Sequence, residues 1–285
     1  MNNKITVNPL VSICIPTYNG EKYIREALES ALSQTYRPLE LIVSDDDSKD
    51  KTIPIIKEIT KGWDIPVKIY NHIPSGIGAN WNNCVKHANG KYIKFLFQDD
   101  ILYPTCIEEM VALAEQDDNI GLIFSDRTII GETKRMETWM QYNKNLTGNW
   151  ENLHEIQPGT ELLSQNFFLN KPNNKIGEPS VVLLRRTCFN EIGFFSEKLK
   201  QSLDYEFWYR LMTKYKIGYI KKELAAFRLH PAQATNINAS QDNNLEESLN
   251  YFKSLKANVF KYLSLRNKIK LIFLICKYKI MRVIT

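Results

Sequence analysis

Two adjacent carboxylates, Asp99 and Asp100, follow a near-continuous apolar run at residues 92–97, with Gln98 between the run and Asp99. Such a run is typical of a strand that is buried on both faces of a parallel sheet. Open α/β sheets bind ligands at the carboxyl ends of their strands. We therefore interpret the two carboxylates as ligands for a divalent cation, Mn²⁺ or Mg²⁺, that in turn holds phosphate oxygens. A solvated turn after the strand is the alternative.

A second acidic strand end favours the metal-site interpretation. Residues 39–43 form another buried apolar run, and the cluster Asp45, Asp46 and Asp47 follows it. An earlier strand, residues 11–15, ends at Pro16, which cannot donate to a sheet ladder. The glycine-rich G-x-G-x-x-G and P-loop patterns are absent, so we expect phosphate binding to depend on a metal.

The elements that must position these residues alternate along the chain. Apolar residues recur at helical spacing after each of the first strands, and further strand patterns occur at residues 67–70 and 120–124. This alternation predicts an α/β fold with a mainly parallel sheet and helices on both faces. Between about residues 127 and 175 the periodicity fades, and Trp139, Tyr142 and Trp150 stand out as candidates for either core packing or sugar stacking. Ser202 is a candidate N-cap for a helix that would carry Asp204 in its first turn.

Several motifs together resemble the family 2 glycosyltransferases, which are inverting nucleotide-sugar transferases with the GT-A fold. The resemblance covers roughly residues 10–235, and each motif is weak alone while their order and spacing are specific. The matching segments are residues 16–20 (PTYNG), 40–50 (ELIVSDDDSKD), 90–95 (GKYIKF) with 98–100 (QDD), 192–195 (IGFF), 204–211 (DYEFWYRL) and 228–230 (RLH).

The resemblance implies a role for each residue at a matching position. It implies that Asp204 is the general base, that Glu178 and Ser180 contact the acceptor, and that the metal-binding D-x-D motif falls on Asp99 and Asp100. Phe97 stands where the first Asp of that motif is usual, so either carboxylate could bind the ion directly. Related enzymes also place a late histidine at the metal or the diphosphate, and the matching residue here is His230. The implied nucleotide-binding residues are Pro16, Thr17, Tyr18, Asn19, Asp45, Asp46 and Asp99.

The chemistry agrees with these roles. A divalent ion on the diphosphate would neutralise charge that develops on the leaving nucleoside diphosphate. An ionised carboxylate would accept the proton of the attacking hydroxyl, and one in-line displacement would invert the configuration. The dipole at the start of a helix is expected to keep Asp204 ionised at neutral pH.

We divide the chain into a GT-A domain at residues 1–235 and a basic amphipathic helical tail at 236–285. Within the domain, residues 10–125 are assigned to the nucleotide sugar and 126–235 to the acceptor. The formal net charge of +5 is uneven, because nine basic and no acidic residues follow Glu247. Ile269, Ile272, Phe273, Cys276, Ile280, Val283 and Ile284 would share one helical face, with Leu271 and Leu274 on the polar side. Packing on the catalytic domain or a partner subunit is the alternative to an anionic membrane surface.

The predicted function is transfer of one sugar from a UDP- or dTDP-sugar to a hydroxyl of a glycan or lipid-linked acceptor in surface polysaccharide synthesis. The alternatives are a sugar nucleotidyltransferase and a non-catalytic nucleotide-sugar-binding module. The Q-x-x-R-W pattern of processive synthases is missing, which favours single addition. The five dispersed cysteines and the lack of a leader or membrane span favour a cytoplasmic protein, peripheral on the inner membrane face, that does not bind nucleic acid.

Overall fold

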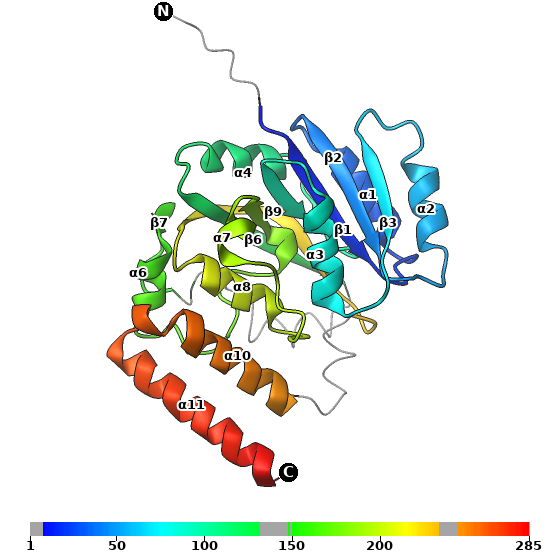
Figure 1. Cartoon of the computed structure of the whole chain (residues 1–285). Helices are drawn as coiled ribbons and strands as arrows, with labels where there is room; N and C mark the ends of the chain where they lie inside the picture. Colours follow the sequence, from blue (N-terminus) through cyan, green and yellow to red (C-terminus); the bar gives the residue numbers. More distant parts are fainter. Residues whose placement is uncertain (1–7, 132–147, 149, 234–243, 285) are drawn as a thin grey trace, which may run out of the picture.

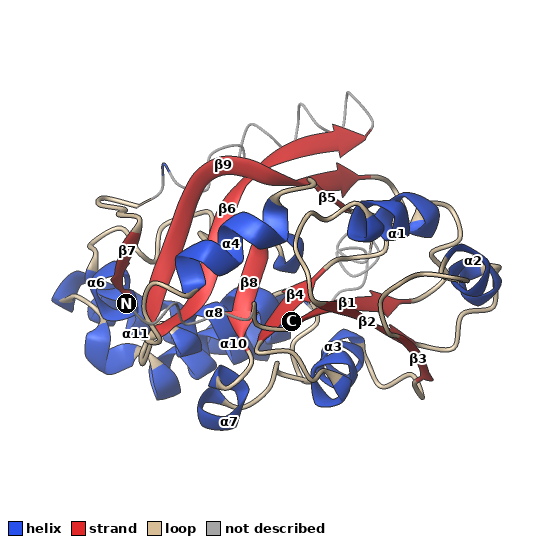
Figure 2. Cartoon of the chain, turned by 90° about the horizontal axis from the view of Figure 1, so that it is seen from above, coloured by secondary structure: helices blue, strands red, loops and turns tan. Residues whose placement is uncertain are grey.

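The computed structural model describes residues 8–131, 148, 150–233 and 244–284. They are organised around one nine-stranded sheet in the order β3-β2-β1-β4-β8-β6-β9-β5, with β7 paired to β9. Helices cover both faces, and Figure 2 shows α1 and α4 on one side of the sheet and α3 and α8 on the other. The predicted α/β class is therefore confirmed.

The first half of the chain alternates strand and helix as predicted. Its strands pair in parallel, with β1 between β2 and β4 and with β3 beyond β2. β1, β2 and β4 are buried along their whole length, which explains their continuous apolar sequences. The elements are β1 (Val11–Thr17), α1 (Ile24–Leu32), β2 (Leu39–Asp45), α2 (Thr52–Ile59), β3 (Val67–Asn71), α3 (Ile77–His87) and β4 (Tyr92–Phe95).

The second half adds antiparallel strands to the same sheet. β8 runs antiparallel to both β4 and β6, and the long β9 is parallel to β6 but antiparallel to β5 and β7. β6 continues through Arg127 to Gly131, although the apolar periodicity fades at Arg127. The elements are β5 (Ile101–Leu102), α4 (Cys106–Ala114), β6 (Ile120–Gly131), β7 (Ile156–Pro158), α6 (Gly159–Ser164), η2 (Pro179–Val181), β8 (Val182–Arg185), α7 (Cys188–Ile192), α8 (Leu203–Leu211) and β9 (Lys216–Leu229).

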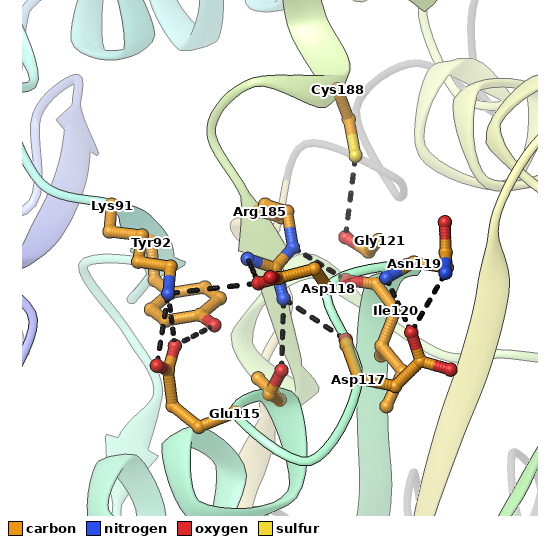
Figure 3. A network of polar contacts seen from close by, with 11 residues as sticks. Lys91, Tyr92, Glu115, Asp117, Asp118, Asn119, Ile120, Gly121, Arg185 and Cys188 are labelled. Carbon is orange, nitrogen blue, oxygen red and sulfur yellow. Dashed lines mark hydrogen bonds and ion pairs between the residues drawn. The ribbon is translucent and has the colours of Figure 1, made fainter.

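A polar network around Arg185 ties the antiparallel seam to the parallel half of the sheet (Figure 3). Arg185, the last residue of β8, lies opposite Tyr92, the first residue of β4. Its guanidinium donates to the carbonyl oxygens of Ile120 and Ala114, both at 2.9 Å. The hydroxyl of Tyr92 bonds the carboxylate of Glu115. Because the guanidinium is buried and its donors are satisfied by backbone oxygens and by the Asp118 carboxylate, the network fixes β8 between β4 and β6.

Two further helices, α10 (Asn244–Asn258) and α11 (Leu265–Ile284), follow and are joined by η3 (Phe260–Tyr262). Leu249, Tyr251 and Leu255 of α10 are part of the same apolar core as the sheet. α11 docks through Leu271 and Ile275, which are buried. None of the helices in the described part of the chain is long and apolar enough to cross a membrane.

α11 packs on the body of the protein through the side that the sequence analysis assigned as polar. Leu271, on that side, is fully buried. The predicted apolar face stays exposed, and Figure 1 shows α11 at the periphery of the molecule. Its exposed large side chains are Ile269, Ile272, Phe273, Ile280, Val283 and Ile284.

Candidate functional site

The carboxyl ends of β1, β2 and β4 meet at one edge of the sheet. The register of the parallel pair places Thr17 of β1 opposite Asp45 of β2. The segment after β4 reaches the same edge, since the side-chain amide of Gln98 bonds both the N–H and the carbonyl of Tyr18 at 2.9 and 3.0 Å. Two distant parts of the sequence are thereby joined at the ends of adjacent strands.

A cavity of about 310 Å³ opens at this edge. Eight of the twelve site residues predicted from the sequence line it: Pro16, Thr17, Tyr18, Asp46, Asp99, Glu178, Asp204 and His230. Asp100, Ser180, Asp45 and Asn19 are not part of the lining. The structure therefore brings most of the predicted residues together and leaves four of them outside the cavity lining.

Asp99 and His230 form the candidate metal-binding pair. The Asp99 carboxylate lies 2.9 Å from Nε2 of His230, although 131 positions separate the two residues. Asp100 points away from the cavity: its Oδ1 accepts the backbone N–H of Arg228 at 3.0 Å, and its buried Oδ2 has no hydrogen-bond partner among the described residues. Burial and the neighbouring Asp99 carboxylate raise the pKa of Asp100. Of Asp99, Asp100 and His230, it is therefore Asp99 and His230 whose side chains can face a ligand in the cavity.

No group of three or more His, Cys, Asp or Glu side chains with metal-site geometry occurs among the described residues. The donor set nevertheless fits a hard cation such as Mg²⁺ or Mn²⁺, which is commonly held by one or two protein ligands together with substrate phosphates. The carboxylate and imidazole at 2.9 Å supply such a partial set, open toward the cavity.

The acidic cluster after β2 divides into two roles. Asp45 stabilises the loop, because its Oδ1 accepts from Thr17 Oγ1 at 2.8 Å and its Oδ2 accepts from Ser48 N at 2.8 Å. Asp46 faces the cavity and lies 2.6 Å from Nδ1 of His72. Asn19 also holds the loop, since its Oδ1 accepts the N–H of Lys49 at 2.8 Å.

Asp204 lies in the first turn of α8 and lines the cavity. Its Oδ2 accepts from Asn174 Nδ2 at 2.9 Å, and its Oδ1 is buried without a hydrogen-bond partner in the described part of the chain. Burial raises the pKa of Asp204 to about 8, and the carboxylates of Glu178 and Glu247 add to the rise. The expectation that the helix dipole keeps this carboxyl ionised is therefore wrong, because the cost of desolvating the charge exceeds the stabilisation by the dipole.

Glu178 is held by an ion pair inside the protein. Arg127 Nε lies 2.7 Å from Glu178 Oε2, and both side chains are largely buried. Ser180 lies beneath the cavity, where its hydroxyl accepts the N–H of Phe97 at 3.0 Å and its carbonyl accepts from the buried Lys94. Ser180 thus supports the end of β4, while Glu178 reaches the cavity.

The sequence interpretation missed several residues of the cavity. Asn80 and Trp81 come from α3, whose apolar spacing signals a helix but does not indicate that one turn faces a ligand. Lys200 and Gln201 precede α8 and carry no motif.

Trp150 is a core residue, buried with its Nε1 bonded to the carbonyl of Lys175 at 2.9 Å. Trp139 and Tyr142 lie outside the described residues.

The comparisons with known proteins agree with this geometry. The model of the family described as "Glycosyl transferase family 2" matches residues 12–193, which include both acidic strand ends. The chain belongs to glycosyltransferase family 2. An uncharacterized glycosyltransferase of Rickettsia typhi is 30% identical over 243 residues, which cover 83% of this chain and 69% of that protein. One from Methanocaldococcus jannaschii is 30% identical over 226 residues, covering 78% and 71%.

Solved structures of glycosyltransferases share the fold. S. aureus TarS, residues 1–349 in complex with UDP-GlcNAc, superposes with a TM-score of 0.64 at 19% identity and covers 94% of this chain and 71% of its own. The mannosyltransferase PcManGT from Pyrobaculum calidifontis, in complex with GDP-Man and Mn²⁺, gives a TM-score of 0.62 at 15% identity, covering 88% and 65%. The family 2 chain described here is therefore a glycosyltransferase with a GT-A fold.

Proposed function

We propose that this protein is an inverting, metal-dependent glycosyltransferase that moves one sugar from a UDP- or dTDP-sugar to a hydroxyl of a glycan or lipid-linked acceptor in surface polysaccharide synthesis. The observation that carries the proposal is the convergence of Asp99, His230 and Asp204 on one cavity. Family membership favours sugar transfer over the nucleotidyltransferase alternative.

The nucleotide would lie against the ends of β1 and β2, where Pro16, Thr17, Tyr18 and Asp46 line the cavity. Asp46 supplies an acceptor for the N–H groups of the base or the hydroxyls of the ribose. His72, which lies 2.6 Å from Asp46, orients that carboxylate. Asp45 and Asn19 then act indirectly, by holding the loop that carries these groups.

Asp99 and His230 would hold Mn²⁺ or Mg²⁺. The cation, when bound, supplies positive charge to the diphosphate leaving group. Asp100 keeps the metal-binding strand end in place through the N–H of Arg228, two residues before His230. PcManGT, whose structure contains GDP-Man and Mn²⁺, provides a precedent for metal use on this fold.

Asp204 acts as the general base by accepting the proton of the attacking hydroxyl at its carboxylate oxygen. Its pKa of about 8 makes it a stronger base than an ordinary aspartate, because burial favours the protonated form. Glu178, held by Arg127, would position the acceptor through hydrogen bonds to its hydroxyls. Ser180 contributes by supporting the strand end.

The tail would attach the enzyme peripherally to the inner face of a membrane that holds a lipid-linked acceptor. The exposed apolar face of α11 and the nine basic residues after Glu247 support this part of the proposal. Apolar side chains can enter the headgroup region while lysine and arginine side chains contact anionic lipids.

The experiment that tests the proposed activity is a thermal-shift screen with UDP, dTDP and GDP and their sugars, with and without Mn²⁺. The correct donor should stabilise the protein by about 2.7 kcal/mol at a hundredfold excess over its Kd. Release of the nucleoside diphosphate from that donor should follow only with the metal present. No stabilisation and no release with any of these donors would contradict the proposal.

A further inference from the structure

A carboxylate from the tail binds the segment that leads into the catalytic helix. Glu247 of α10 accepts the backbone N–H groups of Lys200, Gln201 and Ser202: its Oε2 lies 3.0 Å from Lys200 N, and its Oε1 lies 2.9 Å from the other two nitrogens. The hydroxyl of Ser202 donates to the same Oε1 at 2.5 Å. One side chain therefore satisfies three consecutive backbone donors and a hydroxyl.

This arrangement replaces the ordinary cap of α8. Ser202 is the N-cap residue, but its hydroxyl makes no capping bond to the helix and donates to Glu247 instead. A carboxylate near the start of a helix is also stabilised by the helix dipole. The backbone N–H groups that converge on it form a concave anion-binding site, which in this protein is filled by an internal side chain.

The segment held by Glu247 is part of the site. Lys200 and Gln201 line the cavity, and Asp204 follows Ser202 by two residues. A shift of Ser202 would therefore change where the first turn of α8 begins and where the Asp204 carboxylate lies. Misplacement of a reacting group by about 1 Å can cost roughly a hundredfold in rate.

The rest of α10 is firmly attached to α8, so Glu247 is anchored on a fixed element. Ser254 donates to Glu206 of α8 at 2.5 Å, and the same carboxylate accepts from Arg210 at 2.8 Å. The rings of Tyr251 and Tyr205 pack edge to face with centroids 5.0 Å apart. α10 thus packs against α8.

We propose that Glu247 is a positioning residue for the transfer reaction, which sets the start of α8 and thereby the place of the Asp204 carboxylate. The tail then contributes to the active site in addition to the membrane contact proposed above. This inference rests on the proposed role of Asp204 as the base.

The test is a set of four point variants in the full-length chain. Glu247→Ala removes all four bonds, Glu247→Gln keeps an Oε1 acceptor at the same reach, and Glu247→Asp keeps the charge but withdraws it by one methylene. The exposed neighbour provides the control, Glu246→Ala, since the contact described for Glu246 is an ion pair with Arg282 at 4.0 Å. The assay is Mn²⁺-dependent release of nucleoside diphosphate from the sugar nucleotide of the UDP, dTDP and GDP panel that gives the fastest release, with kcat and donor KM measured separately.

We expect Glu247→Ala to lower kcat by at least about tenfold with little change in donor KM, and Glu247→Gln to retain more activity than Glu247→Asp. Equal kcat in Glu247→Ala and Glu246→Ala, each measured per folded molecule, would overturn the inference. If Glu247→Ala does not fold, the Gln and Asp variants decide, and a kcat equal to that of the wild type in both would overturn it. No release by the wild type from any donor would instead contradict the proposed function, and this inference with it.

Discussion

Replacing Asp204 by Asn should remove both most of the turnover and its dependence on pH. The variant keeps the shape of the side chain and its contact with Asn174, but it cannot accept a proton. Loss of a general base costs about a hundredfold to ten-thousandfold in rate. Donor affinity should change little, because the nucleotide and the metal are assigned to other residues of the cavity.

The pH profile of the wild type follows from the raised pKa of Asp204. With a pKa of about 8, only about a tenth of the molecules carry the ionised base at pH 7. The value of kcat/KM should therefore rise with pH, by roughly fiftyfold between pH 6 and pH 8, and level off above that range. The assay is nucleoside diphosphate release at saturating Mn²⁺ over pH 6–9.

The raised pKa of Asp204 also predicts that the free energy of unfolding falls as the pH rises, whereas kcat/KM increases. Between its ordinary pKa of 3.8 and its native value of about 8, Asp204 stays protonated in the folded protein but ionises in the unfolded chain. Its contribution to the free energy of unfolding is fully present below about pH 4 and is lost as pH rises toward 8. Asp204→Asn should thus gain stability relative to the wild type as the pH rises. A flat wild-type rate profile from pH 6 to 8, with unchanged relative stability, would refute this reasoning.

Two further predictions concern the metal and the tail. Asp99→Asn should weaken Mn²⁺-dependent donor binding at least tenfold by calorimetry, because it removes the carboxylate beside His230; unchanged affinity would rule out Asp99 as a metal ligand. The double variant Phe273→Glu with Ile280→Glu, at side chains 65% and 60% exposed, should abolish co-sedimentation with anionic vesicles while leaving donor hydrolysis intact. Ile73→Glu, at an exposed residue outside the tail, is the control and should bind vesicles as the wild type does; equal binding by all three proteins would exclude α11 as the membrane contact.

The sequence predicts the parts of the site that depend on local pattern. The acidic ends of β2 and β4 follow from apolar runs that stop at aspartates, and parallel pairing brings such ends to one edge. Motif order then identified Asp204 as a helix-start residue, and α8 begins one position earlier at Leu203.

The features that escaped prediction depend on contacts between distant residues. The pKa of Asp204 is set by burial, which the sequence around it does not reveal. In the sequence alone, Glu247 is an ordinary helix residue, because its contacts form only when α10 packs against α8. The sequence places Leu271 on the polar side of a basic helix, yet that side of the helix packs on the body of the protein.

The central claim, single-displacement transfer with Asp204 as the base, is tested most directly by the anomeric configuration of the first-formed product. The donor from the thermal-shift screen is incubated with enzyme and Mn²⁺, and the sugar released to water or to an acceptor is followed by proton NMR before it can mutarotate. An α-linked donor should give the β-anomer first, and Asp204→Asn should slow its appearance without altering donor binding. First appearance of the α-anomer would contradict the account.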